Sequence, residues 1–74
     1  RFEAIVYPNP ANGVVRIEGG EADEVIVYDA LGQVVKRVQG TNEIDVADLA
    51  EGIYLLRIHD KQGLSHTNRI MVTK

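Results

Sequence analysis

The chain has 74 residues, with 8 Lys and Arg against 11 Asp and Glu, so its formal net charge is −3. This length predicts one domain over residues 1–74 and excludes a large multidomain enzyme. The chain has no cysteine, and its apolar runs fall short of the roughly 20 residues that span a bilayer. Its acidity, and strand faces without clustered Lys and Arg, argue against a nucleic-acid partner.

Short apolar segments rich in β-branched residues alternate with Gly, Pro, Asn and Asp, a pattern typical of strands joined by turns. The pattern predicts seven strands, over residues 4–7, 14–18, 24–29, 33–38, 43–46, 53–59 and 64–73. The gaps are too short for the crossovers that parallel strands need, and only residues 46–51 suit a helical turn. The sequence therefore predicts an all-β, antiparallel β-sandwich.

The first corner, from Tyr7 to Gly13, contains Pro8 and Pro10, which fix the backbone and end the first strand. By itself this segment predicts a rigid connector in which Gly13 takes a positive φ. Two later turns, 29–32 and 60–63, both begin with Asp and end with Gly. Because Asp accepts backbone N–H bonds and Gly tolerates positive φ, both are predicted to be hairpin turns.

Alternation within the strands predicts which side chains face the core. The inward-facing side chains are expected to be Val15, Ile17, Ile44, Val46, Tyr54, Leu56, Ile58, Ile70 and Val72. The strand around residues 25–28 is apolar on both faces, which predicts a central or covered strand. Partial exposure of four outward residues would form an apolar docking patch; they are Ile26, Tyr28, Leu55 and Met71.

Few side chains suggest catalysis. His59 and His66 flank the last hairpin and are expected on one face, but two imidazoles make a poor zinc site. The acidic stretch over residues 18–29 lacks the spacing of a calcium loop and predicts a solvated rim. Ser65 is the only serine and lies inside a predicted strand. We therefore expect no catalytic residue, no cofactor and no metal ligand.

Four segments in chain order together resemble one family. They comprise Tyr7, Pro8, Asn9, Pro10 and Gly13; Asp29 and Gly32; Gly52 and Tyr54; and the closing run Arg69, Ile70, Met71, Val72, Thr73 and Lys74. These residues resemble the type A C-terminal sorting domain of the type IX (Por) secretion system. The resemblance implies an immunoglobulin-like β-sandwich of about seven strands and a non-enzymatic signal that directs a cargo protein across the outer membrane.

The resemblance also implies partners and a route. The expected partners are the outer-membrane translocon, a shuttle protein, a sortase-like C-terminal signal peptidase that removes the domain, and the parent cargo protein. The expected route runs through the periplasm to the outer membrane, cell surface or extracellular space. A homodimer through an exposed strand edge is a further expectation, because strands that are apolar on both faces favour association.

We expect the last strand to carry recognition, through Arg69, Ile70, Met71, Val72 and Lys74. A strand at the end of a chain can offer an unpaired edge and a carboxylate to a receptor. Two alternatives remain open: a structural or adhesive β-sandwich spacer of a secreted protein, which would work within a longer chain, and an enzyme.

Overall fold

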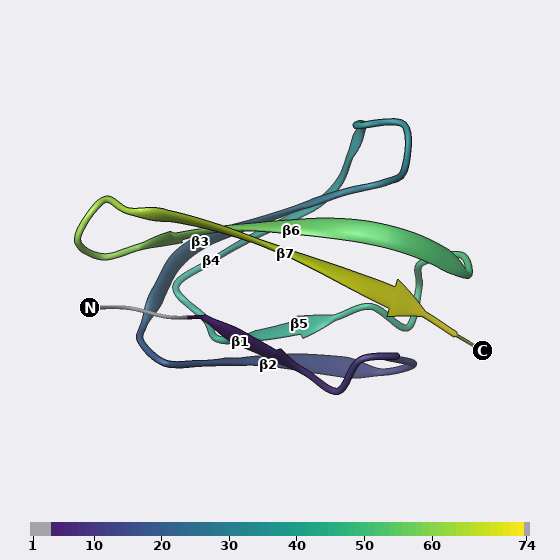
Figure 1. Ribbon diagram of the computed structural model, residues 1–74, viewed down its shortest axis with the longest axis horizontal. Coiled ribbons are helices and arrows are strands. Elements are labelled where there is room, and N and C mark those ends of the chain that lie inside the picture. The colour runs from purple at the N-terminus through teal and green to yellow at the C-terminus, as the bar shows by residue number, and fades with distance from the viewer. Residues whose placement is uncertain (1–3, 74) are drawn as a thin grey trace.

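The computed structural model describes residues 4–73, which form two antiparallel β-sheets packed face to face (Figure 1). One sheet has the order β1-β2-β5 and the other β4-β3-β6-β7. The strands are β1 (Ile5–Tyr7), β2 (Val14–Glu18), β3 (Ala22–Tyr28), β4 (Val34–Gln39), β5 (Glu43–Asp45), β6 (Gly52–Asp60) and β7 (Ser65–Val72). The predicted all-β, immunoglobulin-like sandwich of seven strands is confirmed, and strand ends differ from prediction by at most two residues.

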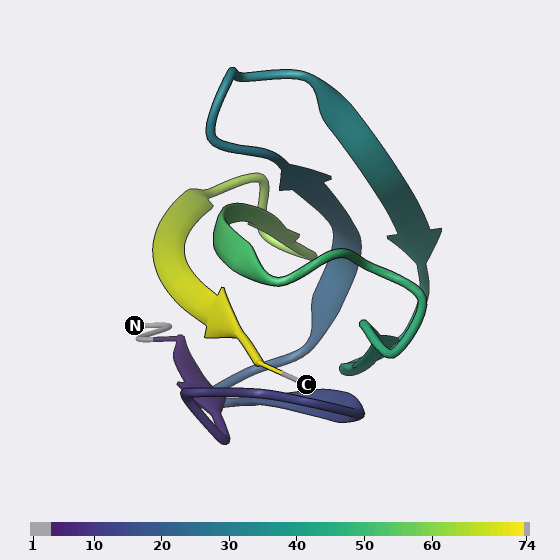
Figure 2. The same ribbon diagram turned by 90° about the vertical axis from the view of Figure 1, so that its right-hand side faces the viewer.

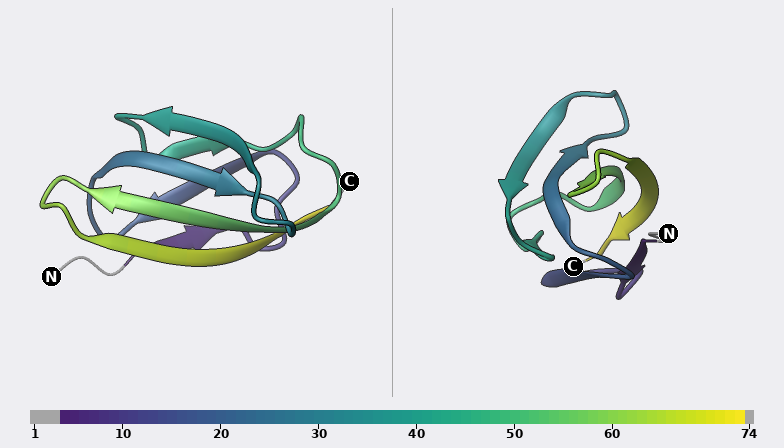
Figure 3. Two further views of the ribbon diagram at one scale, coloured as in Figure 1. Left: turned by 90° about the horizontal axis from the view of Figure 1, so that it is seen from above. Right: turned by 90° about the vertical axis from the view of Figure 1, so that its left-hand side faces the viewer.

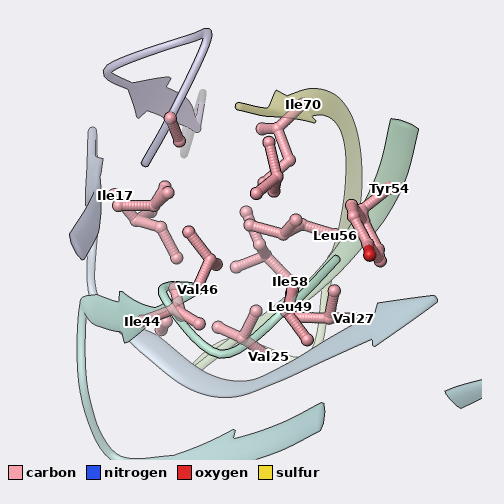
Figure 4. Packing of buried hydrophobic residues seen from close by; sticks show 14 residues of the cluster. Ile17, Val25, Val27, Ile44, Val46, Leu49, Tyr54, Leu56, Ile58 and Ile70 are labelled. Carbon is pink, nitrogen blue, oxygen red and sulfur yellow. The ribbon is translucent and has the colours of Figure 1, made fainter. Parts of the chain in front are cut away.

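The core lies between the two sheets and is built from alternate residues of each strand (Figure 4). All nine side chains predicted to face inward are buried; eight lie on the four strands β2, β5, β6 and β7, and Val46 lies directly after β5. Leu56 and Ile58 on β6 are fully buried, whereas their neighbour Leu55 is 41% exposed. The period-2 geometry of a strand explains this difference, because successive side chains point to opposite faces.

Strand β3 is central, as its apolar character on both faces predicts, because it pairs with β4 on one side and β6 on the other. The condition for the apolar docking patch is not met at Ile26, since only 7% of this residue is accessible. The register places Ile26 opposite Arg37 on β4 and opposite Arg57 on β6. We attribute its burial to the aliphatic stems of these two flanking arginines.

The connection between the sheets depends on Asn42, which the sequence analysis did not single out. Its amide nitrogen donates to the carbonyl oxygens of Ile17 (2.9 Å) and Gly20 (2.7 Å), and its amide oxygen accepts from the Ala22 N–H (3.0 Å). These bonds brace the corner where the chain leaves β2 and enters β3. Residues 46–49 form one hydrogen-bonded turn, and residues 4–73 contain no helix.

Both Asp-to-Gly hairpin turns are confirmed and share one geometry. In the first, Asp29 Oδ1 accepts from the N–H groups of Leu31 (2.9 Å) and Gln33 (3.0 Å), and Gly32 has φ +84°. In the second, Asp60 Oδ1 accepts two equivalent backbone bonds, and Gly63 has φ +88°. A carboxylate and a left-handed glycine thus close each hairpin.

Replacing Gly32 or Gly63 by Val is expected to lower the free energy of unfolding by about 1–2 kcal/mol, because L residues are disfavoured at these φ values. Open space surrounds both positions, so the loss comes from the backbone and not from a clash. Gly32→Asn, the matched control, should cost less because Asn tolerates the left-handed region. Urea unfolding tests this expectation, and unchanged stability in both Val variants would contradict it.

Candidate recognition site

Four of the five expected recognition residues lie on β7, an edge strand that pairs with β6. Ile70 and Val72 are each 1% exposed and point into the core, whereas Arg69 and Met71 face solvent. The buried pair therefore anchors the strand, while the outward pair is accessible to a partner. Lys74 lies outside the described residues.

The corner that follows β1 lies directly against this strand (Figure 2). The Tyr7-Pro8 and Asn9-Pro10 peptide bonds are both cis. Between the two prolines, Asn9 Nδ2 donates to the carbonyl of Arg69 (3.1 Å), and Asn9 Oδ1 accepts from the N–H of Met71 (3.0 Å). One side chain thus pairs with two backbone groups on the outer edge of β7.

Ala11 continues the same pairing along the edge. Its N–H donates to the carbonyl of Met71 (2.8 Å), and its carbonyl accepts from the N–H of Thr73 (2.8 Å). The prediction that the last strand offers an unpaired edge is therefore wrong between Arg69 and Thr73. The edge is covered because the corner supplies the donors and acceptors that a neighbouring strand would otherwise supply.

The other residues of the family motif have structural roles. Tyr7 contacts β2, whereas Tyr54 on β6 pairs with β7. Tyr7 donates its hydroxyl to Glu18 (2.7 Å), a bond that raises the pKa of Tyr7. The prediction that Gly13 takes a positive φ is wrong, because the φ angle of this glycine is not positive. Tyr54 is buried opposite Ile70 on β7 and donates its hydroxyl to the Ala50 carbonyl (2.6 Å).

The two histidines do not share a face, which corrects the prediction. His59 pairs with Ser65 across the last hairpin and lies on the outer side of the sheet, whereas His66 pairs with the buried Ile58. A shift of one residue in a strand moves a side chain to the other face. Among residues 4–73, no three His, Cys, Asp or Glu side chains gather into a metal-binding group.

Asp60 is buried and joins the last hairpin to His66, whose Nε2 lies 3.2 Å from Asp60 Oδ2. Burial acts to raise the pKa of Asp60, but hydrogen bonds from Leu64, His66 and Gln62 outweigh burial and lower the pKa below its ordinary value of 3.8. The folded state therefore favours the ionised carboxylate.

This lowered pKa predicts how the stability depends on pH. The contribution of Asp60 is fully present above the unfolded-state pKa near 3.8 and is lost as pH falls through the lower folded-state pKa. Asp60→Asn should therefore show a flatter acid limb in urea unfolding measured from pH 5 to pH 2. Asp29→Asn, at a turn with the same pair of backbone bonds but a less buried carboxylate, is the control. Equal acid limbs for wild type and Asp60→Asn would contradict the expectation.

Two of the shallow hollows on the described surface are relevant to the site. The larger, about 330 Å³, lies where β6 begins and β7 ends, and its walls are Glu51, Gly52, Ile53, Met71, Val72 and Thr73. The smaller, about 120 Å³, lies beside Tyr7 and Arg16 on the other sheet. The larger hollow therefore adjoins the exposed residues of the candidate recognition strand.

The fold defines a small all-β sandwich domain whose last strand has a covered edge. Comparison with known proteins gives its family: residues 5–73 match the secretion system C-terminal sorting domain. The chain is also 34% identical over 70 residues to Beta-agarase D of Zobellia galactanivorans, a match that covers 93% of this chain and 15% of that protein's length. The chain belongs to the C-terminal sorting domains of the type IX (Por) secretion system.

Membership of this family implies a parent protein that is secreted to the outer membrane, the cell surface or the extracellular space. It also favours a non-enzymatic role. Within residues 4–73, no helix is long and apolar enough to cross a bilayer.

Proposed function

We propose that this domain is a non-enzymatic sorting signal whose last strand is recognised by the secretion machinery while the cargo is in the periplasm. The shuttle protein and the outer-membrane translocon then deliver the cargo, and a sortase-like peptidase removes the domain. The observation that carries this proposal is the anchoring of β7. Asn9 and Ala11 hold its edge and Ile70 and Val72 hold its inner face, so that its outward side chains are presented on a fixed strand.

In this proposal the recognition residues divide into two groups. Arg69 and Met71, together with Lys74 at the end of the chain, contact the receptor, whereas Ile70 and Val72 fix the strand in the core. Recognition then depends on side chains and the chain end instead of strand addition between Arg69 and Thr73, where the backbone groups already have partners.

A secretion assay tests the proposal. Residues 1–74 are fused to the C-terminus of a signal-peptide-bearing fluorescent reporter and expressed in a strain with a working type IX system and in a translocon-null strain. Delivery to the surface or medium only in the competent strain is the expected result. Periplasmic retention in both strains, with the domain folded, would instead favour a structural or adhesive spacer.

Substitutions of exposed residues separate recognition from folding better than a deletion of residues 70–74, because that segment includes two core side chains. Arg69→Ala with Met71→Ala should reduce secretion at least tenfold. Arg16→Ala with Val14→Ala, on the outer side of β2, is the matched control and should be secreted normally. Equal secretion of both double variants would contradict the proposed role of β7.

Self-association stays a prediction, and we propose β4 as the edge it would use. Strand β4 pairs with β3 alone among the described strands, and its Val34 and Val35 are 50% and 39% exposed. An edge with exposed apolar residues favours pairing with a second chain. A monomeric mass in light scattering would contradict a homodimer.

A further inference from the structure

Figure 3 (left) shows the strands of the four-stranded sheet side by side. The pairing register places three arginines, from three different strands, on the outer face of this sheet. Arg37 on β4 and Arg57 on β6 lie on either side of Ile26, in one row across the sheet. Arg69 on β7 lies opposite Leu55 and is therefore diagonal to Arg57. Diagonal neighbours of this kind lie roughly 7–8 Å apart, so long side chains can act on one ligand.

Two of these three charges are not neutralised within residues 4–73. Arg37 lies 3.2 Å from Glu24, but Arg57 and Arg69 form no ion pair with residues 4–73. Both arginines are exposed, in a chain whose net charge is −3. The outer face is thus locally cationic on an acidic protein.

Apolar side chains continue this face toward the larger hollow. Leu55 is 41% exposed, Ile53 37% and Met71 44%, and Ile53 lies directly opposite Met71 on β7. The hollow of about 330 Å³ has both Ile53 and Met71 in its walls. Two arginines therefore adjoin an apolar strip that ends in a depression.

The combination of exposed arginines and an apolar strip suits one class of ligand better than others. A second copy of the chain, docked by two-fold symmetry on this face, would bring arginines against arginines. A polyanion such as nucleic acid would leave the apolar strip without a partner, and it would meet the acidic Glu51 at the hollow. A protein segment that carries carboxylates beside an apolar side chain matches both parts of the face.

We propose that the outer face of β6 and β7 docks an acidic protein segment, with carboxylates on Arg57 and Arg69 and an apolar side chain in the hollow beside Ile53 and Met71. This inference rests on the proposed function, since the segment belongs to the receptor that recognises the sorting domain. Arginine pairs with carboxylates in a two-pronged geometry, which fixes orientation as well as charge.

The test uses the reporter fusion in the secretion-competent strain, with the photo-cross-linking residue p-benzoylphenylalanine at position 55. The same residue at position 14, a similarly exposed valine on the outer side of the other sheet, is the control. We expect a cross-link from position 55 to a protein segment rich in Asp or Glu with an apolar residue among them. The cross-link should be at least tenfold weaker from position 14.

Charge reversal then tests the arginines. Arg57→Glu with Arg69→Glu should weaken the cross-link at least tenfold, and reversing the partner's carboxylates to Arg should restore it. Arg16→Glu with Lys61→Glu, which changes the net charge equally away from this face, should leave it intact. Circular dichroism verifies that each variant is folded.

The outcomes separate this inference from the proposed function. Normal secretion without a cross-link at position 55, a partner segment without acidic residues, or equal loss in both charge-reversal variants would overturn the inference alone. Failure of the unmodified fusion to be secreted would overturn the proposed function and, with it, this inference.

Discussion

Replacing Leu56 by Ala is expected to lower the free energy of unfolding by about 2–5 kcal/mol. Leu56 is fully buried on β6, a strand with neighbours on both sides, and it lies between the two sheets (Figure 4). Truncation to Ala removes apolar contacts and leaves a cavity that two packed sheets close only in part. The loss is measured by urea unfolding at neutral pH.

This loss is large for a small domain. Stabilities of roughly 0.05–0.15 kcal/mol per residue imply about 4–11 kcal/mol for a chain of 74 residues. Leu55→Ala is the matched control, because this adjacent leucine points outward and is 41% exposed. It should cost less than about 1 kcal/mol. Equal losses for the two variants would contradict the assigned faces of β6.

Replacing Asn9 by Ala is expected to cost about 1–3 kcal/mol and to uncover the edge of β7. The substitution removes both side-chain bonds, to the Arg69 carbonyl and from the Met71 N–H, and leaves two backbone groups without their partner. Hydrogen exchange at the Met71 amide should accelerate at least tenfold, and urea unfolding gives the loss of stability.

Asn12→Ala serves as the control for this prediction. Asn12 belongs to the same corner and is exposed, and its side chain forms no hydrogen bond with residues 4–73. Its replacement should change stability by less than about 0.5 kcal/mol. Because exposed strand edges promote association, Asn9→Ala should also raise the apparent mass in light scattering. Unchanged Met71 exchange in Asn9→Ala would show that the corner does not protect β7.

The hydrogen bonds of Asn9 show that the corner between β1 and β2 covers the edge of β7. The sequence by itself predicts a rigid connector there, and the prolines account for its shape. The structure adds that this connector presents one amide side chain to a strand 60 residues away. Such a contact leaves no periodic or local signal, because it depends on how β1 and β7 lie beside each other in the sandwich.

The same distinction explains the arginine face. Each of the strands β4, β6 and β7 contains a single arginine, so no single strand shows a cluster of arginines. Only the sheet order β4-β3-β6-β7 and the pairing register align Arg37, Arg57 and Arg69 on one surface. The faces of His59 and His66 were likewise decided by the hairpin register, which placed His59 opposite Ser65.

The sequence alone determined the seven strands, the inward side chains and the two Asp-to-Gly turns. These features follow from alternation within a strand and from hydrogen bonds between residues at most four apart, so each is encoded where it occurs. The tertiary structure decided the burial of Ile26, the covering of the β7 edge and the gathering of the arginines. Each of these depends on pairing between distant segments, which is set by the free energy of the whole sandwich and not by any local segment.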